Sequence, residues 1–105
     1  MLTTRIRPEQ LKEFEQSVQQ TAGKFPREVV RVRYSFAEDW SGDPAIYFRI
    51  VLSDEASRRD KLGDTTRRIR SELTDDLRLD ESEYIPYFDF RSKAEQDKLK
   101  DPEWE

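Results

Sequence analysis

Two runs of alternating apolar and polar residues, VVRVRYSF at 29–36 and AIYFRIVL at 45–52, constrain the fold most strongly. A period of two is typical of a β-strand with one dry face, because successive side chains leave opposite sides of the backbone. The connector 37–44 is rich in the turn formers Asp, Ser, Gly and Pro. The pattern therefore predicts an antiparallel hairpin closed by a loop.

The two faces of this hairpin differ in chemistry. The even-numbered positions are almost all apolar: Val30, Val32, Tyr34, Phe36, Ile46, Phe48, Ile50 and Leu52. We expect these side chains to form the core face of the sheet. The odd-numbered positions mix arginine, tyrosine and valine: Arg31, Arg33, Ser35, Tyr47, Arg49 and Val51. We expect this second face to meet solvent or a partner, or to be covered by a second copy or by the C-terminal helix.

Two amphipathic helices are predicted on either side of the hairpin. The first begins near Pro8 and ends at Gly23, with apolar residues at helical spacing: Leu11, Phe14, Val18 and Ala22. The second is expected over about 61–79, and its stripe is Leu62, Thr66, Ile69, Leu73 and Leu77. Gly63 near its start favours a late beginning or a kink, because glycine weakens a helix.

A third strand is predicted at 84–91, YIPYFDFR, with Tyr87 on the odd-numbered face. Pro86 cannot donate to a ladder, so this strand is expected at a sheet edge, beside the first strand. Ser92 and Glu95 form a capping box that opens a short helix through Lys100. Only Ala94 and Leu99 give that helix apolar contacts, and we expect it to dock weakly before a tail at 101–105.

The predicted order is therefore α-β-β-α-β-α in one domain, 1–105, with 92–105 as a short C-terminal helix and tail. The fold class is α+β: a two-layer sandwich in which a three-stranded, mainly antiparallel sheet carries both main helices on one face.

Composition argues against several functions. The 105 residues include neither cysteine nor histidine, which removes thiolate chemistry and the commonest general base and metal ligand. The glycines are too widely spaced for a phosphate-binding loop. We therefore expect no enzymatic activity, no cofactor and no metal. No membrane span or signal peptide is visible, and a cytoplasmic location is the expectation.

Charge is unevenly distributed along the chain. The formal net charge is −4, which argues against sequence-blind binding to phosphate backbones. Residues 57–72 are nevertheless basic, and residues 74–89 are acidic. Two interpretations stay open for the basic run: a solvated helix face, which is the commoner case, or a patch aimed at an acidic partner.

The hairpin loop carries Glu38, Asp39 and Asp43 near Gly42. Carboxylates in such a loop can bind a hard cation, but the spacing matches no calcium-loop pattern. We expect a simple turn with Trp40 folded back on the domain. An exposed Trp40 would instead indicate an anchor for a partner protein.

Our functional hypothesis is a non-enzymatic regulatory module that binds another protein, or a second copy of itself. Arginine and tyrosine are enriched at binding hot spots, and tryptophan is a common anchor. The predicted contact residues are Arg31, Arg33, Trp40, Tyr47, Arg49 and Tyr87. The alternative is a KH-like RNA or ribosome contact through the same face and the basic part of the second helix.

From residue 29 onward the layout resembles that of ribosome-binding factor A and other KH-like domains. The corresponding segments are the hairpin VVRVRYSF and AIYFRIVL, the helix LGDTTRRIRSELTDDLRL with a small residue near its start, and the aromatic strand YFDF. This resemblance implies a KH-like fold and an RNA or ribosome contact, although the GxxG loop of many KH domains is absent. The chain is also similar to small bacterial proteins, some of which are encoded beside a partner that they neutralise or regulate.

Overall fold

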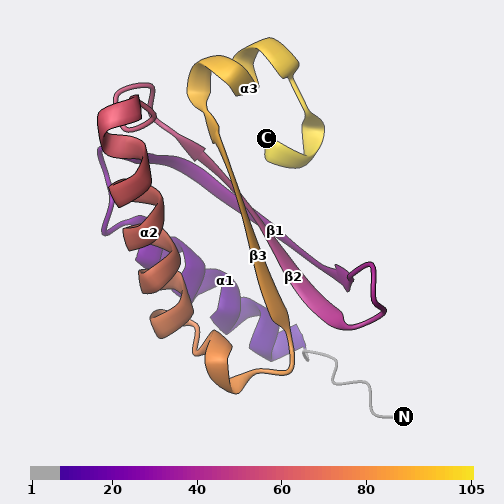
Figure 1. Ribbon diagram of the computed structural model, residues 1–105. Coiled ribbons are helices and arrows are strands. Elements are labelled where there is room, and N and C mark those ends of the chain that lie inside the picture. Colours follow the sequence, from indigo (N-terminus) through magenta and orange to yellow (C-terminus); the bar gives the residue numbers. More distant parts are fainter. Residues whose placement is uncertain (1–7) are drawn as a thin grey trace.

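The computed structural model describes residues 8–105, and the chain follows the predicted order of elements (Figure 1). The helices are α1 (Pro8–Ala22), α2 (Arg59–Asp76) and α3 (Lys93–Leu99). The strands are β1 (Val29–Glu38), β2 (Pro44–Leu52) and β3 (Ile85–Ser92). Two short 3-10 helices are η1 (Leu79–Glu81) and η2 (Pro102–Trp104).

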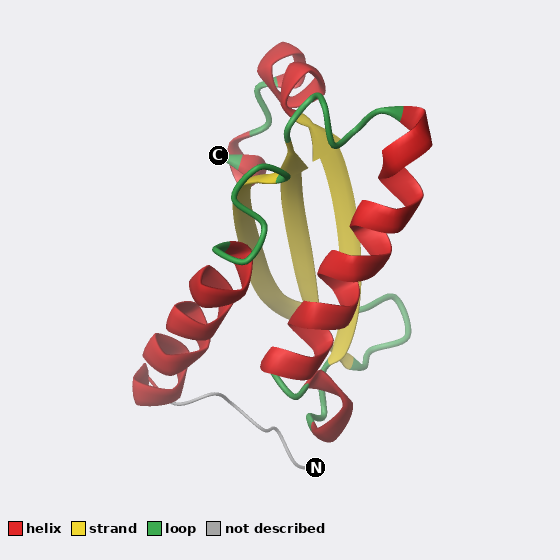
Figure 2. Ribbon diagram, turned by 90° about the vertical axis from the view of Figure 1, so that its left-hand side faces the viewer, coloured by secondary structure: helices red, strands yellow, loops and turns green. Residues whose placement is uncertain are grey.

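The helices α1 and α2 lie on the same side of the three-stranded sheet, which gives the predicted two layers (Figure 2). The polypeptide after β3 turns to the other side, so that α3 and η2 lie apart from the two long helices (Figure 1). The α+β class and the two-layer arrangement are thus confirmed.

The position of the third strand differs from our prediction. β3 pairs with β2 rather than with β1, and it runs parallel to β2, so the sheet is mixed with the order β1-β2-β3. The β2-α2-β3 connection is long enough for a helical crossover, which is what parallel neighbours require. β2 also suits the central position, because Ala45 and Val51 on its odd-numbered face are fully buried as well.

The even-numbered face forms the core, as predicted. The buried cluster includes Val18 and Phe25 from the α1 region, Ile69 and Leu73 from α2, and the even-numbered residues of the sheet: Val32, Ile46, Phe48, Ile50 and Leu52. Aromatic rings fill the part of the core near α1. There Phe48 and Phe88, which are paired in register, stack at 5.1 Å between ring centroids. Offset stacking of this kind stabilises a core beyond the area that it buries.

Val30 is an exception to this parity and is 41% exposed. The ladder pairs Val29 with Leu52 and then Arg31 with Val51, so Val30 is the extra residue of a β-bulge. A bulge shifts the alternation by one position. Val29 consequently packs against the core in place of Val30.

α2 begins and ends slightly earlier than predicted, and its buried residues are Thr65, Ile69 and Leu73. Leu62, which we expected in the stripe, is 37% exposed. The helix is held to α1 by polar contacts: the Thr21 hydroxyl donates to Asp76 at 2.7 Å, and Lys24 lies 2.8 Å from the carboxylates of both Asp76 and Glu72. These contacts fix the layer that supports the sheet from behind.

Candidate functional site

The odd-numbered side chains form four rows across the sheet, because β1, β2 and β3 are paired in register. The rows are Arg31-Val51-Arg91, Arg33-Arg49-Asp89, Ser35-Tyr47-Tyr87 and Ala37-Ala45-Ile85. The first two rows hold the arginines, and we call Arg31, Arg33, Arg49 and Arg91 the arginine half. The other two rows lie toward the β1-β2 loop, and we call Trp40, Tyr47, Ile85 and Tyr87 the aromatic half.

The chain itself covers most of the arginine half, and of its four arginines only Arg33 is exposed. η2 packs against β1 and β2 on this side, and Trp104 is only 3% exposed. Arg31 Nε donates to the Trp104 carbonyl at 2.7 Å, and Arg33 Nε donates to the Glu105 carbonyl at 3.0 Å. Val51, predicted to lie on an open face, is therefore fully buried.

Arg91 organises the other side of this contact. Its guanidinium lies 4.1 Å from the centre of the Trp104 ring and 3.4 Å from the carboxylate of Asp101. It also donates at 2.8 Å to the side-chain oxygen of Gln96, a fully buried residue of α3. The amide nitrogen of Gln96 in turn donates to the Asp101 carbonyl and to the Glu105 carboxylate.

The C-terminal segment thus docks more firmly than we predicted, and residues 101–105 are not a loose tail. The capping box is present, since the Glu95 amide donates to the Ser92 hydroxyl at 3.0 Å. Docking depends, however, on Gln96 and Trp104, while Leu99 is 55% exposed. The signal in the sequence was a tryptophan among three acidic residues in DPEWE, which complements a face rich in arginine.

The aromatic half has a different character. The rings of Tyr47 and Tyr87 stack at 5.1 Å between centroids with an interplanar angle of 14°. Both tyrosines are partly exposed, and Ile85 beside them is 40% exposed. The tyrosines line a hollow of about 270 Å³ together with Arg49 and Asp89. This region thus presents a stacked aromatic pair beside an exposed isoleucine at the surface.

The loop between β1 and β2 projects past the end of the sheet (Figure 1) and is held by Asp39, which is only 8% exposed. One carboxylate oxygen of Asp39 accepts from the Ser41 amide at 2.9 Å, from the Ser41 hydroxyl at 2.7 Å and from the Asp43 amide at 3.0 Å. The other accepts from the Tyr87 hydroxyl at 2.8 Å. Gly42 has a φ of 88°, which favours glycine. The loop therefore has one well-braced conformation that is tied to β3.

Trp40 is 91% exposed, the most exposed of the large hydrophobic residues in the described part of the chain. It does not fold back on the domain, which corrects our expectation of a simple turn. The reason is local: the Asp39 carboxylate accepts from the amides of Ser41 and Asp43, which fixes the backbone around Trp40 while the indole stays in solvent.

The hydrogen bonds of the loop also change the ionisation of two groups. Donation by the Ser41 hydroxyl, with further donors from Tyr87 and two backbone amides, lowers the pKa of Asp39 to about 2. The hydrogen bond from the Tyr87 hydroxyl to Asp39 raises the pKa of Tyr87, because loss of its proton would place a second negative charge beside the carboxylate. Both carboxylate oxygens of Asp39 thus already accept hydrogen bonds from the loop or from Tyr87. Within residues 8–105, no group of three or more acidic side chains is arranged to hold a metal ion.

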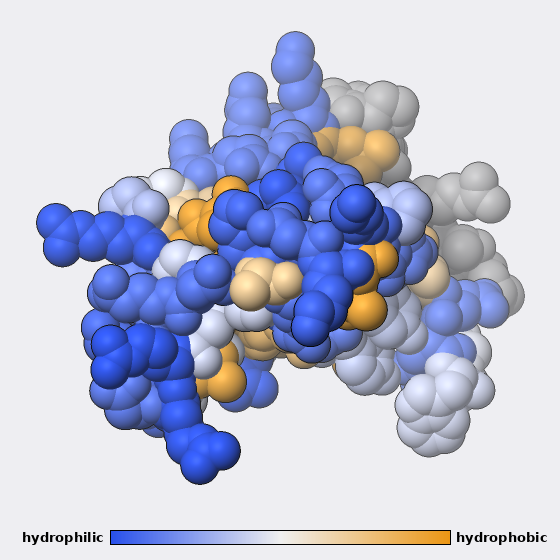
Figure 3. All heavy atoms as spheres, turned by 90° about the horizontal axis from the view of Figure 1, so that it is seen from above, coloured by the Kyte–Doolittle hydropathy of each residue, from blue (hydrophilic) through white to orange (hydrophobic). Residues whose placement is uncertain are grey.

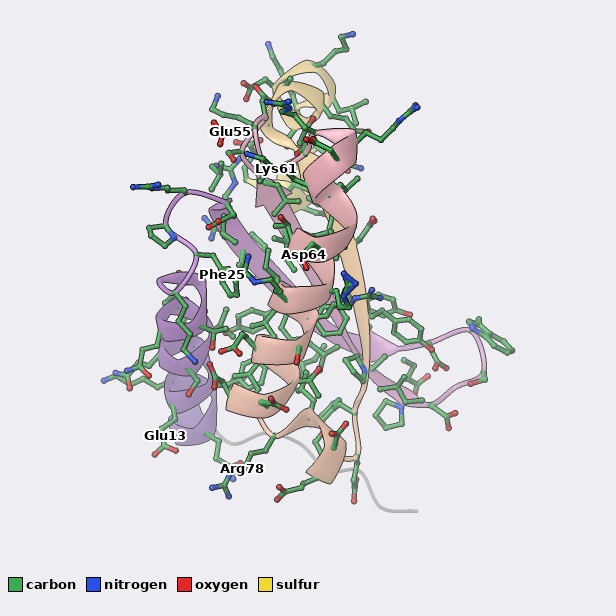
Figure 4. The ribbon with its side chains drawn as sticks, turned by 60° about the vertical axis from the view of Figure 1, so that its left-hand side comes forward. Glu13, Phe25, Glu55, Lys61, Asp64 and Arg78 are labelled. Atoms are coloured by element: carbon green, nitrogen blue, oxygen red, sulfur yellow. The ribbon has the colours of Figure 1, made fainter. Side chains whose placement is uncertain are left out.

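Several cations of the basic run at the start of α2 are paired with neighbouring acids. Lys61 lies 3.2 Å from Glu55 (Figure 4). Asp64 lies 3.4 Å from Arg67 and 3.9 Å from Arg68. Seen from above, the surface is mostly hydrophilic, and its hydrophobic areas are small and separate (Figure 3). This arrangement fits the interpretation of a solvated helix face.

The structure brings the six predicted contact residues to one face or to its adjoining loop, but it divides them. Arg31, Arg33 and Arg49 contact the C-terminal segment or its neighbours, whereas Trp40, Tyr47 and Tyr87 remain at the surface. None of the helices in residues 8–105 has the length and apolar character needed to cross a bilayer. Comparison of the chain with protein-family models, curated proteins and solved structures gives no match.

Proposed function

We propose that this chain is a non-enzymatic protein-binding module whose contact surface is the aromatic half, with Trp40 as the anchor. The observation that carries the proposal is a tryptophan 91% exposed on a loop whose backbone is fixed by Asp39. Tryptophan and tyrosine dominate the binding energy of many interfaces. A solvent-exposed indole on a rigid loop supplies this energy with little loss of conformational entropy on binding.

The neighbours of Trp40 support the same surface. Tyr87 is linked to the Trp40 loop through Asp39, and its ring stacks on Tyr47. A partner that buries Trp40 would therefore also meet aromatic rings already fixed in place. The arginines predicted for this role are less available, since the C-terminal segment lies against them.

RNA is the alternative partner that the KH-like resemblance favours, and that resemblance stays a prediction. Stacking of unpaired bases on Tyr47 and Tyr87 would suit single-stranded RNA. The net charge of −4 and the paired state of the basic run on α2 argue for protein instead.

The proposal is tested with a photo-crosslinking amino acid at position 47, introduced into the full chain in the cells that produce it. The chain with Trp40 in place should give a discrete crosslinked product with one partner protein. Trp40→Ala should reduce the yield of that product at least about tenfold, the loss expected for a hot spot. Leu99→Ala is the matched control, because Leu99 is 55% exposed but lies on α3, away from the aromatic half.

Treatment with ribonuclease before analysis separates the two kinds of partner. A crosslinked band that survives nuclease and depends on Trp40 supports the protein interface. A band that is lost after nuclease assigns the surface to RNA. Equal crosslinking by the wild type and Trp40→Ala would overturn the proposed role of the anchor.

A further inference from the structure

The arginine half concentrates more positive charge than the sheet itself balances. Arg33 and Arg49 are direct partners in the β1-β2 ladder. Arg31 and Arg91 lie on either side of Val51 in the next row. Like charges opposite each other destabilise a sheet, so such a cluster requires anionic groups from elsewhere.

Residues 101–105, DPEWE, supply these groups from outside the sheet. Their ion pairs are Asp101 with Arg91 at 3.4 Å, Glu103 with Arg49 at 3.8 Å and Glu105 with Arg31 at 3.7 Å. Trp104 adds an indole ring beneath the Arg91 guanidinium, an arrangement in which the ring quadrupole attracts the cation. The segment therefore meets the sheet as a bound peptide would, with paired carboxylates around one buried aromatic anchor.

Residues 101–105 are held by one buried ring and by polar contacts, but they lie outside the hydrophobic core, so they can open while the core stays folded. Each of its ion pairs has a partly exposed carboxylate, and such pairs contribute little individually. The segment joins α3 through Lys100, which has a left-handed φ of 53° that is unfavourable for a residue with a side chain. A short segment outside the hydrophobic core opens at far lower cost than the core does.

We propose that the arginine half is a binding site for an acidic peptide that carries a tryptophan, and that residues 101–105 occupy it in cis. A partner protein with such a sequence takes their place, pairing its carboxylates with Arg31, Arg49 and Arg91 and inserting its indole beside Arg91. The tethered segment competes at an effective concentration on the order of millimolar, so exchange needs a tight partner or a weakened tether. This site is distinct from the aromatic half and does not depend on it.

The test is the fluorescence anisotropy of a labelled peptide with the sequence of residues 99–105, LKDPEWE, added to the full-length chain. The double variant Glu103→Gln/Glu105→Gln weakens only the tethered copy, because it removes the charge of two side chains that are 67% and 55% exposed. The amide oxygen of glutamine at position 105 can still accept the hydrogen bond from Gln96, so the fold is retained. We expect the peptide to bind this variant about threefold to tenfold more tightly than the wild type, the effect of two partly exposed ion pairs.

Three controls make the result specific. The peptide LKDPEAE, which lacks the indole, should bind the double variant much more weakly than LKDPEWE does. Adding Arg31→Gln to the double variant removes one proposed partner of the peptide and should weaken binding, whereas adding Trp40→Ala should leave it unchanged. Undetectable binding of LKDPEWE to the double variant, binding no tighter than to the wild type, or equal binding of LKDPEAE would each overturn the proposal.

Discussion

Asp39 shows how one side chain fixes the conformation of a surface loop. Its donors stabilise the carboxylate, so its pKa of about 2 in the folded chain lies below the ordinary value of about 3.9. The stabilisation that follows is fully present above the unfolded pKa and is lost as the pH falls through about 2. We therefore expect an NMR titration of the Asp39 carboxyl carbon to have its midpoint near pH 2.

The tyrosine pair supplies a control for this titration. Tyr87→Phe removes one donor to the carboxylate and should raise the pKa of Asp39. Tyr47→Phe should leave it unchanged, because Tyr47 stacks on Tyr87 without donating to Asp39. An ordinary pKa for Asp39 in the wild type would mean that the loop is not braced in solution.

Thr21 joins the two helices of the supporting layer. Its hydroxyl donates to Asp76 at 2.7 Å, and the residue is 1% exposed. Thr21→Val keeps the shape but removes the donor, and it should lower the free energy of unfolding by about 1 kcal/mol in urea titrations. Thr66→Val is the comparison, because the Thr66 hydroxyl bonds only the Gly63 carbonyl of its own helix. Equal losses would mean that the Thr21–Asp76 hydrogen bond contributes nothing measurable.

At the scale of elements, two glycines should respond in opposite ways to alanine. Gly63 lies in α2, and a Cβ added there would meet no atom within 4 Å, so Gly63→Ala should stabilise the chain by about 0.5–1 kcal/mol. Gly42 also has open space, but its φ of 88° is unfavourable for alanine, and Gly42→Ala should destabilise the chain. Urea unfolding of both variants measures the difference. A loss of stability in Gly63→Ala would indicate a strained or closely packed start of α2.

Sequence patterns predicted those elements whose burial follows a regular period. The even-numbered residues of β2, such as Phe48 and Ile50, are fully buried, as their period-two alternation predicted. Periodicity carries no information on strand order, so the place of β3 beside β2 was predicted wrongly. It also cannot register an inserted residue, and the bulge moved Val30 out of the core.

The sequence pattern also could not predict that the arginine half is largely covered while the aromatic half stays at the surface. α3 docks through Gln96, a polar residue that no apolar stripe includes, and through Trp104, which follows the helix as an isolated aromatic. Trp104 is held by Arg31, which lies 73 residues earlier in β1, and by Arg91 in β3, which also bonds Gln96. Contacts of this kind are visible only when the chain is folded, although the charge complementarity was present in the composition of the segments.

At the scale of the whole molecule, the two tryptophans should separate stability from recognition. Trp104 packs the C-terminal segment against the sheet, and its side chain is only 3% exposed. Trp104→Ala should therefore lower the free energy of unfolding by about 3 kcal/mol, as for other buried aromatic residues. Trp40 is 91% exposed, and Trp40→Ala should change that free energy by less than about 0.5 kcal/mol.

Fluorescence checks the same assignment independently of unfolding. In Trp104→Ala the remaining emission comes from Trp40 and should be red-shifted and readily quenched by iodide, because that indole is in water. In Trp40→Ala the emission of Trp104 should be blue-shifted and protected. Equal quenching of the two variants would mean that the segment leaves the sheet in solution, which would return the arginine half to solvent and make all six predicted contact residues available together.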